Sequence, residues 1–385
     1  MTERRRVMVI FGTRPDALKM APVVRALRAH RDELAPVVVV TAQHREMLDQ
    51  VLRLFSIDPD YDLNVMTGAQ SLADITIRTL RGLEQVIEQV APAIVVVQGD
   101  AAPSYVGALA AFYRKIAVAH VEAGLRTDDK YQPFPEEMYR RMTSVLADLH
   151  FAPTATARAN LEREGVARAR ITVTGNTVID TLLDVAGRAD LAVDPGVREL
   201  LARPGRWVLL TTHRRENWGE PQHRIFHAVR DLLDRFVDLE LVFPVHLNPV
   251  VGDPARAILG THPRAHLFPP LDYASIVRTM QAATLILTDS GGIQEEAPAL
   301  GRPVLVLRDT TERPEGILAG TAKLVGTDPA AILDAAAELL TDRAAHARMA
   351  QARNPYGDGR AAERIVAVLR RQLGFEVNIP AEFAV

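Results

Sequence analysis

The chain has 385 residues, of which 48% are hydrophobic and 24% charged, as expected for a globular protein with two domains. Its formal net charge of −3 provides no basic field for nucleic acid, and the absence of cysteine excludes disulfides, thiolate catalysis and cysteine-ligated metals. The first apolar run, residues 7–11, is too short for a signal peptide or a membrane span. These features predict a cytoplasmic protein with no nucleic-acid or membrane partner.

Short apolar runs rich in β-branched residues alternate with helical patterns along the chain. Strands are expected at residues 7–11, 37–41, 94–98, 117–121 and 171–174, and in a second series at 208–212, 241–245, 285–288 and 304–307. Helical patterns are expected at residues 17–28, 71–89, 222–236, 330–340 and 361–373. Strands that are apolar on both faces and alternate with helices indicate an α/β fold with parallel sheets covered on both sides.

The two series of strands are separated by residues 187–205. This stretch contains Asp194-Pro195-Gly196 and Arg203-Pro204-Gly205, which are typical of turns and linkers. We therefore expect one doubly wound, Rossmann-like domain over residues 1–187 and a second over residues 206–360. A further hypothesis is that the C-terminal segment, residues 361–385, packs back on the first domain.

Polar residues follow several of the expected strands, at the point where each strand ends. They are Gly12-Thr13-Arg14-Pro15, Gly99-Asp100, Glu122 to Arg126, His213 to Asn217, His246 and Asp289 to Gly292. Ligands of open parallel sheets bind beyond the carboxyl ends of the strands. Because these residues come from both halves of the chain, the sequence predicts one cleft shared by the two domains.

The turn Ser290-Gly291-Gly292 opens a short helical segment. Glycines allow a ligand to approach the backbone closely, and the N–H groups at the start of a helix attract an anion. The alternative is a tight strand-to-helix connection, but two arginines in the polar run 308–315 favour a phosphate site. Glu296, further along this segment, suits the hydroxyls of a ribose. Its alternative is a charge that stabilises the helix dipole.

Three carboxylates are candidates for proton transfer. Asp100 and Glu122 follow two strands of the first domain, and Glu136 lies in a proline-rich loop that enters a helix. Carboxylates gathered at one site can act as acid and base. The alternatives are a helix cap for Asp100 and a first-turn helix charge for Glu136. No Asp-x-Asp pair occurs at these strand ends, so we expect no metal. His213, among arginines at a strand end, suits a departing phosphate.

Taken together and in order, the motifs resemble the bacterial non-hydrolysing UDP-N-acetylglucosamine 2-epimerase family over nearly the whole chain. The residues that carry the resemblance are Gly12 to Pro15, Gln98-Gly99-Asp100, His120 to Thr127, Pro133 to Glu137, His213 to Asn217, Pro244 to Pro249, Thr288 to Pro298, Thr310 to Gly316 and Asn354 to Gly359. The resemblance implies the GT-B fold, with the active site between two Rossmann-like domains, and a homodimer.

The resemblance also implies a reaction, the interconversion of UDP-N-acetylglucosamine and UDP-N-acetylmannosamine at C2. UDP is eliminated in the anti sense to give a 2-acetamidoglucal and is then added back, and no redox cofactor is needed. Asp100, Glu122, Glu136 and His213 match the family's catalytic residues. The positions that match its UDP-sugar site are Arg14, Lys19, Arg140, the segment Leu271 to Ile276, Ser290, Gly291, Gly292, Glu296 and Arg313.

Three residues near the expected sugar pocket depart from the family pattern. Ala101 and Ala102 replace two threonines, and Tyr139 replaces an asparagine. They leave the rate and the exact sugar open, and they motivate the alternative of a catalytically weak UDP-sugar-binding protein. A hydrolysing 2-epimerase that releases N-acetylmannosamine and UDP shares the elimination step and is a second alternative, and a GT-B glycosyltransferase is a third.

The positions that match a second site of the family, which binds an activator, also depart from the family pattern. Gln43, His44, Arg214 and His246 match an activator site of some family members, but Glu46 replaces a glutamine and Ala69 an arginine. The added negative charge and the lost positive charge predict weak or absent activation by substrate.

Overall fold

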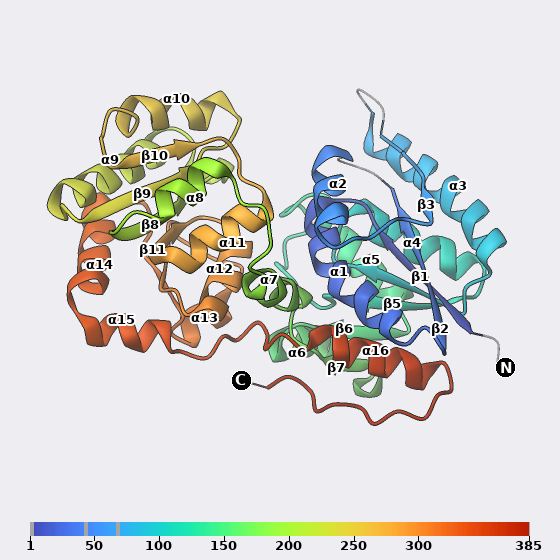
Figure 1. Cartoon of the computed structure of the whole chain (residues 1–385). Helices are drawn as coiled ribbons and strands as arrows, with labels where there is room; N and C mark the ends of the chain where they lie inside the picture. The colour runs from blue at the N-terminus through green and yellow to red at the C-terminus, as the bar shows by residue number, and fades with distance from the viewer. Residues whose placement is uncertain (1–3, 42–44, 67–69, 385) are drawn as a thin grey trace. The chain divides into compact units, whose positions relative to one another are not determined.

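The computed structural model describes residues 4–41, 45–66 and 70–384 (Figure 1). The chain divides into two compact units, residues 1–181 with 357–384, and residues 182–356. The change of unit falls inside α7 (Thr177–Gly187), whereas the sequence-based domains end at residue 187 and start again at 206.

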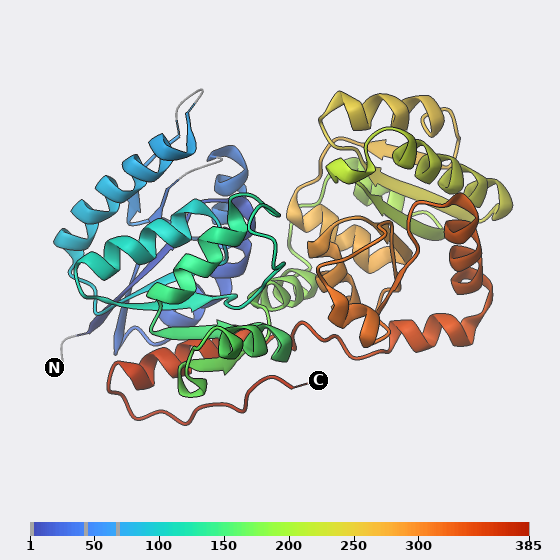
Figure 2. The same ribbon diagram turned by 180° about the vertical axis from the view of Figure 1, so that it is seen from behind.

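The first unit contains a parallel sheet in the order β3-β2-β1-β4-β5-β6-β7. Its strands are β1 (Arg5–Phe11), β2 (Leu34–Val40), β3 (Tyr61–Asp62), β4 (Ile94–Gln98), β5 (Ala117–Val121), β6 (Leu149–Ala152) and β7 (Ile171–Val173). Its helices are α1 (Arg14–Ala29), α2 (Arg45–Leu54), α3 (Leu72–Val90), α4 (Ala102–Tyr113), α5 (Glu136–Leu146), α6 (Ala155–Arg163) and α16 (Ala361–Gln372), with a 3-10 turn at Arg168–Arg170. Figure 2 shows the same elements from behind.

The second unit contains a parallel sheet in the order β10-β9-β8-β11-β12-β13. Its strands are β8 (Arg206–Thr211), β9 (Leu239–Pro244), β10 (Ala265–Phe268), β11 (Ala283–Thr288), β12 (Val304–Val306) and β13 (Ala322–Leu324). Its helices are α8 (Pro195–Leu201), α9 (Glu220–Arg235), α10 (Pro249–Ile258), α11 (Tyr273–Ala282), α12 (Gly291–Glu296), α13 (Pro314–Leu318), α14 (Pro329–Thr341) and α15 (Arg343–Ala350), with 3-10 turns at Arg215–Asn217 and Ala297–Leu300.

Helices cover both faces of each sheet, because the residues of a strand point alternately to the two faces and both sets are buried. In the second unit, Val208 and Leu210 of β8 face the core under α9, α10 and α14, while Trp207 packs with Leu200 of α8. In the first unit, Met8 and Ile10 of β1 face α3 and α4, and α1 lies on the other side with α16. The predicted α/β class with two doubly wound parallel sheets is confirmed.

The structure also corrects the sequence analysis. Strands β3, β6, β10 and β13 were not expected, because they are short and their apolar runs are interrupted by Asp, His or Lys. The segment Asp194-Pro195-Gly196, interpreted as a linker, is instead the start of α8. The Asp194 side chain accepts a hydrogen bond from the Val197 N–H at 3.1 Å, and a proline in the first turn suits a helix start.

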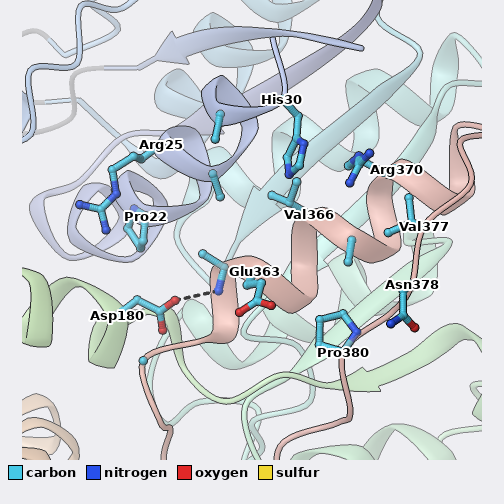
Figure 3. A pocket seen from close by; sticks show the side chains of 15 residues that line it. Pro22, Arg25, His30, Asp180, Glu363, Val366, Arg370, Val377, Asn378 and Pro380 are labelled. Carbon is cyan, nitrogen blue, oxygen red and sulfur yellow. Dashed lines mark hydrogen bonds between the residues drawn. The ribbon is translucent and has the colours of Figure 1, made fainter. Parts of the chain in front are cut away.

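Helix α16 is held against the first unit at both of its ends. Asp180 of α7 accepts hydrogen bonds from the backbone N–H groups of Ala361 and Ala362, at 3.1 and 2.8 Å, and Arg370 pairs with Glu33 at 2.7 Å. Burial raises the pKa of Asp180 to about 6. A cavity of about 490 Å³ lies between α1, α16 and the following segment, with Asp180 at its edge (Figure 3).

Replacing Asp180 with alanine is expected to lower the free energy of unfolding by about 1–3 kcal/mol, because two N–H groups of α16 lose their acceptor. Urea unfolding followed by circular dichroism measures the change. Tryptophan fluorescence, which reports the second unit through Trp207 and Trp218, serves as an internal reference. Glu363→Ala is the matched control, since it removes only a half-exposed pair with Arg360 and should cost less than about 1 kcal/mol. Equal losses in both variants would contradict the anchoring role.

Candidate active site

In each unit, predicted site residues follow both of the strands between which the strand order reverses. In the first unit these strands are β1, followed by Arg14, and β4, followed by Asp100. In the second they are β8, followed by His213, and β11, followed by Ser290. Such switch points, at the carboxyl ends of parallel strands, are where doubly wound sheets bind ligands.

Glu122 follows β5 and is fixed by hydrogen-bond donors from three other segments. Lys19 Nζ lies 2.7 Å from its Oε1, Asn176 Nδ2 donates to the same oxygen at 3.0 Å, and the Gln98 amide donates to Oε2. The side chain is almost buried, and its backbone has a positive φ of 61°. A strained, buried and fully oriented carboxylate is typical of a functional position.

Asp100 lies close to this group, one residue after Gly99. Gly99 has a φ of +64°, and a Cβ on it would lie 3.2 Å from Glu122 Oε2, so the chain approaches the Glu122 carboxylate closely there. Asp100 Oδ2 pairs with Arg140 at 2.8 Å and is about one third exposed. Ala101 occupies the cap position of α4, which argues against the alternative in which Asp100 caps this helix.

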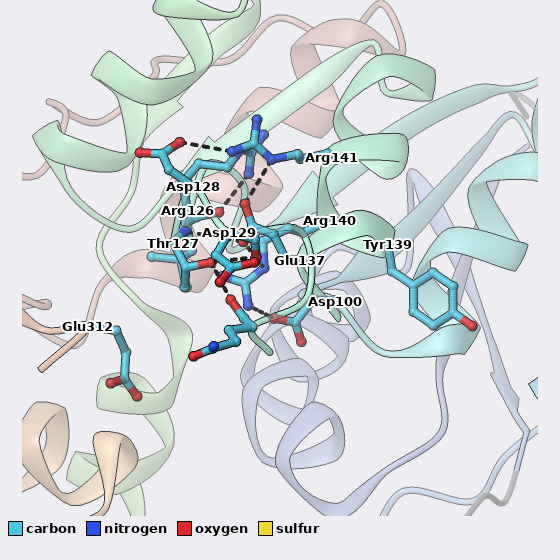
Figure 4. Close-up of polar contacts among 12 residues, drawn as sticks. Asp100, Arg126, Thr127, Asp128, Asp129, Glu137, Tyr139, Arg140, Arg141 and Glu312 are labelled. Carbon is cyan, nitrogen blue, oxygen red and sulfur yellow. Dashed lines mark hydrogen bonds and ion pairs between the residues drawn. The ribbon is translucent and has the colours of Figure 1, made fainter. Parts of the chain in front are cut away.

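Glu136 and Glu137 begin α5 but have different surroundings. Glu136 is half-buried in the first turn, so the catalytic and helix-charge interpretations both remain predictions. Glu137 is fully buried, accepts from the Thr127 N–H at 3.2 Å and pairs with Arg141 at 2.8 Å. The hydrogen bond from Thr127 joins the loop before α5 to the helix (Figure 4).

Tyr139 packs against a second helix of the first unit. Its ring stacks on Tyr105 of α4, with centroids 5.5 Å apart and planes 10° apart, and Figure 4 shows it pointing away from Asp100. The next residue, Arg140, points toward Asp100. Tyr139, which replaces the family's asparagine, therefore makes a packing contact between α4 and α5, and its place near the sugar pocket stays a prediction.

Asp289 organises the first polar loop of the second unit, although the sequence analysis did not single it out. Its side chain is completely buried and accepts from the N–H groups of His213 and Arg214, the Thr212 hydroxyl and the Asn217 amide, at 2.8–3.1 Å. His213 Nδ1 lies 3.4 Å from Asp289 Oδ1. Burial lowers the pKa of His213, and the Asp289 carboxylate opposes this shift. The imidazole is therefore mainly neutral near pH 7.

Two of the four predicted activator-site residues lie beside this loop. The ring of His246 stacks on that of His213 at a centroid distance of 6.3 Å, and Arg214 pairs with Glu312 at 2.8 Å. Gln43 and His44 lie outside the described residues. The activator site stays a prediction, with two members next to predicted substrate residues.

The turn Ser290-Gly291-Gly292 enters α12, which ends after six residues and continues as a 3-10 turn. This matches the short helical segment expected after the turn, and Pro298 lies in the first turn of the 3-10 helix. A Cβ on Gly291 would lie 3.1 Å from Glu312 Oε1 and 3.5 Å from Arg214 Nη2. The glycine therefore permits a close approach of charged side chains to the backbone.

Glu296 links the two segments that are predicted to bind the nucleoside. Its carboxylate accepts from the Tyr273 hydroxyl at 2.6 Å, which joins α12 to the segment from Leu271 to Ile276. Leu271 is buried and Ile276 half-buried. Arg313 donates to the buried Glu295, so it is oriented by α12 as well.

Of the remaining predicted positions, Arg14 is half-buried in the first turn of α1, and Lys19 is the partner of Glu122. Asn176, just after β7, was missed. Gln98 and Asp289 were named at strand ends, and Tyr273 and Glu312 lie inside named segments, but none of the four was given a role of its own, since those roles depend on side-chain contacts in the fold.

The part of the chain that the structure describes holds no group of three His, Asp or Glu side chains placed to bind a metal ion. None of its helices is long and apolar enough to cross a membrane.

Comparison with known proteins places the chain in a family. A family model described as UDP-N-acetylglucosamine 2-epimerase matches residues 25–370. The Bacillus subtilis UDP-N-acetylglucosamine 2-epimerase is 50% identical over 98% of both chains. A Staphylococcus aureus relative solved with UDP is 48% identical, with a TM-score of 0.88, over 99% of this chain and 100% of that one.

The Neisseria meningitidis UDP-GlcNAc 2-epimerase bound to UDP-GlcNAc is 45% identical, with a TM-score of 0.86, over 95% of this chain and 100% of that one. These likenesses confirm the predicted GT-B class. On this evidence, the chain belongs to the UDP-N-acetylglucosamine 2-epimerase family.

Proposed function

We propose that the protein interconverts UDP-N-acetylglucosamine and UDP-N-acetylmannosamine by anti elimination of UDP and its re-addition to the 2-acetamidoglucal. The observation that supports this most is that predicted residues follow the switch-point strands of both sheets. They are Arg14 and Asp100 in the first unit, and His213 and the turn Ser290-Gly291-Gly292 in the second. That both groups act on one UDP-sugar stays a prediction.

The chemistry needs proton transfer on both faces of C2, because epimerisation removes a hydrogen from one face and returns it to the other. Asp100 and Glu122 are the proposed proton-transfer groups, with Glu136 as the third carboxylate. Lys19, Gln98 and Asn176 orient Glu122, and Arg140 orients Asp100. A positioned carboxylate of this kind contributes about 10²–10⁴-fold to a rate.

The second unit is proposed to hold UDP before and after the bond to the sugar breaks. The backbone of Ser290-Gly291-Gly292 and the guanidinium group of Arg313 suit the pyrophosphate, and Glu296 suits the ribose hydroxyls. A neutral His213 can donate a hydrogen bond to the phosphate oxygen that leaves C1. The proposed reaction is redox-neutral, and no cofactor has a role in it.

Incubation with UDP-N-acetylglucosamine in D₂O, followed by NMR, tests the proposal. We expect deuterium at C2 and the appearance of UDP-N-acetylmannosamine without net release of UDP. Accumulation of free N-acetylmannosamine and UDP would instead indicate the hydrolysing reaction. UDP binding without any exchange would indicate a binding protein. Ala101 and Ala102, which bring no hydroxyl next to Asp100, are the features that favour this last alternative.

A further inference from the structure

Glu312 is surrounded by positive charge in the second unit. Its carboxylate accepts from Arg214 at 2.8 Å and from Arg308 at 2.5 Å, and the backbone carbonyl of the same residue accepts from Arg313 at 3.3 Å. Burial raises the pKa of Glu312, but the guanidinium groups of Arg214, Arg313 and Arg308 outweigh it and hold the pKa at about 2. The Glu312 carboxylate is therefore ionised near neutral pH.

This carboxylate also lies against the glycine turn. Glu312 Oε1 is the atom nearest to a Cβ built on Gly291, at 3.1 Å, followed by Arg214 Nη2 at 3.5 Å and Arg313 Cζ at 3.9 Å. An anion at this turn would therefore meet a fixed negative charge together with the guanidinium groups that should attract it. Two like charges a few ångströms apart repel each other, more strongly in a partly buried site than in water.

We propose that the Glu312 carboxylate competes for Arg214 with the pyrophosphate of a UDP-sugar bound at the adjacent glycine turn, and thereby weakens nucleotide binding and speeds nucleotide release. The inference rests on the proposed function, since it takes the pyrophosphate to bind at Ser290-Gly291-Gly292. Glu312 would then lower the affinity of the protein for UDP and UDP-sugars. An enzyme that returns UDP to the same sugar must hold it firmly, but it must also let the product go. A competing internal anion meets both needs.

The test is UDP binding by isothermal titration calorimetry, with the dissociation rate from stopped-flow competition. Glu312→Gln keeps the size of the side chain and an oxygen acceptor but removes the charge. We expect UDP to bind about tenfold more tightly to this variant at low salt and to dissociate more slowly. The difference should shrink as the salt concentration rises, because salt screens charge repulsion. Glu312→Asp keeps the charge but withdraws it by one methylene, and we expect a smaller gain.

Glu216→Gln is the matched control. Glu216 contacts Arg308 at 2.7 Å, so this variant also removes one negative charge beside that arginine. It leaves Glu312, the carboxylate nearest to Gly291, unchanged. UDP affinity should change by less than about threefold in this variant. Unchanged or weaker UDP binding in both Glu312 variants, with UDP binding by the wild type intact, would overturn the inference alone. A wild-type protein that did not bind UDP would overturn the proposed function, and the inference with it.

Discussion

Replacing Glu122 with glutamine is expected to lower the rate of deuterium incorporation at C2 by about 100- to 10,000-fold, which is the usual contribution of a positioned acid or base. The amide cannot take a proton from carbon. It also places an NH₂ group among side chains that donate, namely Lys19 Nζ, Gln98 Nε2 and Asn176 Nδ2. The measurement is NMR in D₂O with UDP-N-acetylglucosamine, at saturating substrate.

UDP affinity separates a catalytic role for Glu122 from a structural one. UDP should still bind to Glu122→Gln within about threefold of the wild type, because most of the proposed UDP contacts, at Ser290-Gly291-Gly292, Glu296 and Arg313, belong to the second unit. The matched control is Glu164→Gln. Glu164 is a carboxylate of the same unit that pairs with Arg126 at 2.6 Å and with Arg141 at 3.0 Å. Full exchange in Glu122→Gln would refute its role, and equal losses in the two variants would point to a general effect on the first unit.

Long strands could be predicted from the sequence because burial on both faces demands an unbroken apolar run. Strands 94–98 and 117–121 match β4 and β5 residue for residue, and the other expected strands differ by a few residues at their ends. The sequence gives no such signal for β3, which has two residues, or for β10, which pairs with β9 although His266 interrupts it. Pairing with a neighbour, which is a tertiary contact, decides these short strands.

A candidate site could be predicted because the carboxyl ends of parallel strands converge at one edge of the sheet, whatever the loops do. Its details could not be predicted, because they depend on which way each side chain points. Arg140 and Tyr139 are neighbours in sequence but differ by about 100° around α5. Arg140 therefore reaches Asp100, while Tyr139 stacks on Tyr105. Gln98, Asn176 and Asp289 lie at or just after strand ends, where the sequence analysis looked for site residues. The role inferred for Glu312 depends instead on its contacts with Arg214 and Gly291 in the folded structure.

Replacing Asp289 with asparagine is expected to lower the free energy of unfolding of the second unit by about 2–4 kcal/mol and to reduce the epimerisation rate by about tenfold or more. The buried carboxylate is surrounded by donors only, from Thr212, His213, Arg214 and Asn217. An asparagine would present an NH₂ group to one of them and leave two donors facing each other. It would also remove the negative charge beside His213.

The two effects of Asp289→Asn have separate measurements. Urea unfolding followed by the fluorescence of Trp207 and Trp218 reports stability of the second unit, and exchange in D₂O reports the rate. Because Asp289 acts against the burial that lowers the pKa of His213, its removal should lower that pKa further. Any limb of the pH–rate profile due to His213 should then move to lower pH, which a purely structural role would not cause. Asp309→Asn, an exposed aspartate after β12, is the control and should change neither quantity. A stable, fully active Asp289→Asn protein would show that this loop does not depend on the buried carboxylate.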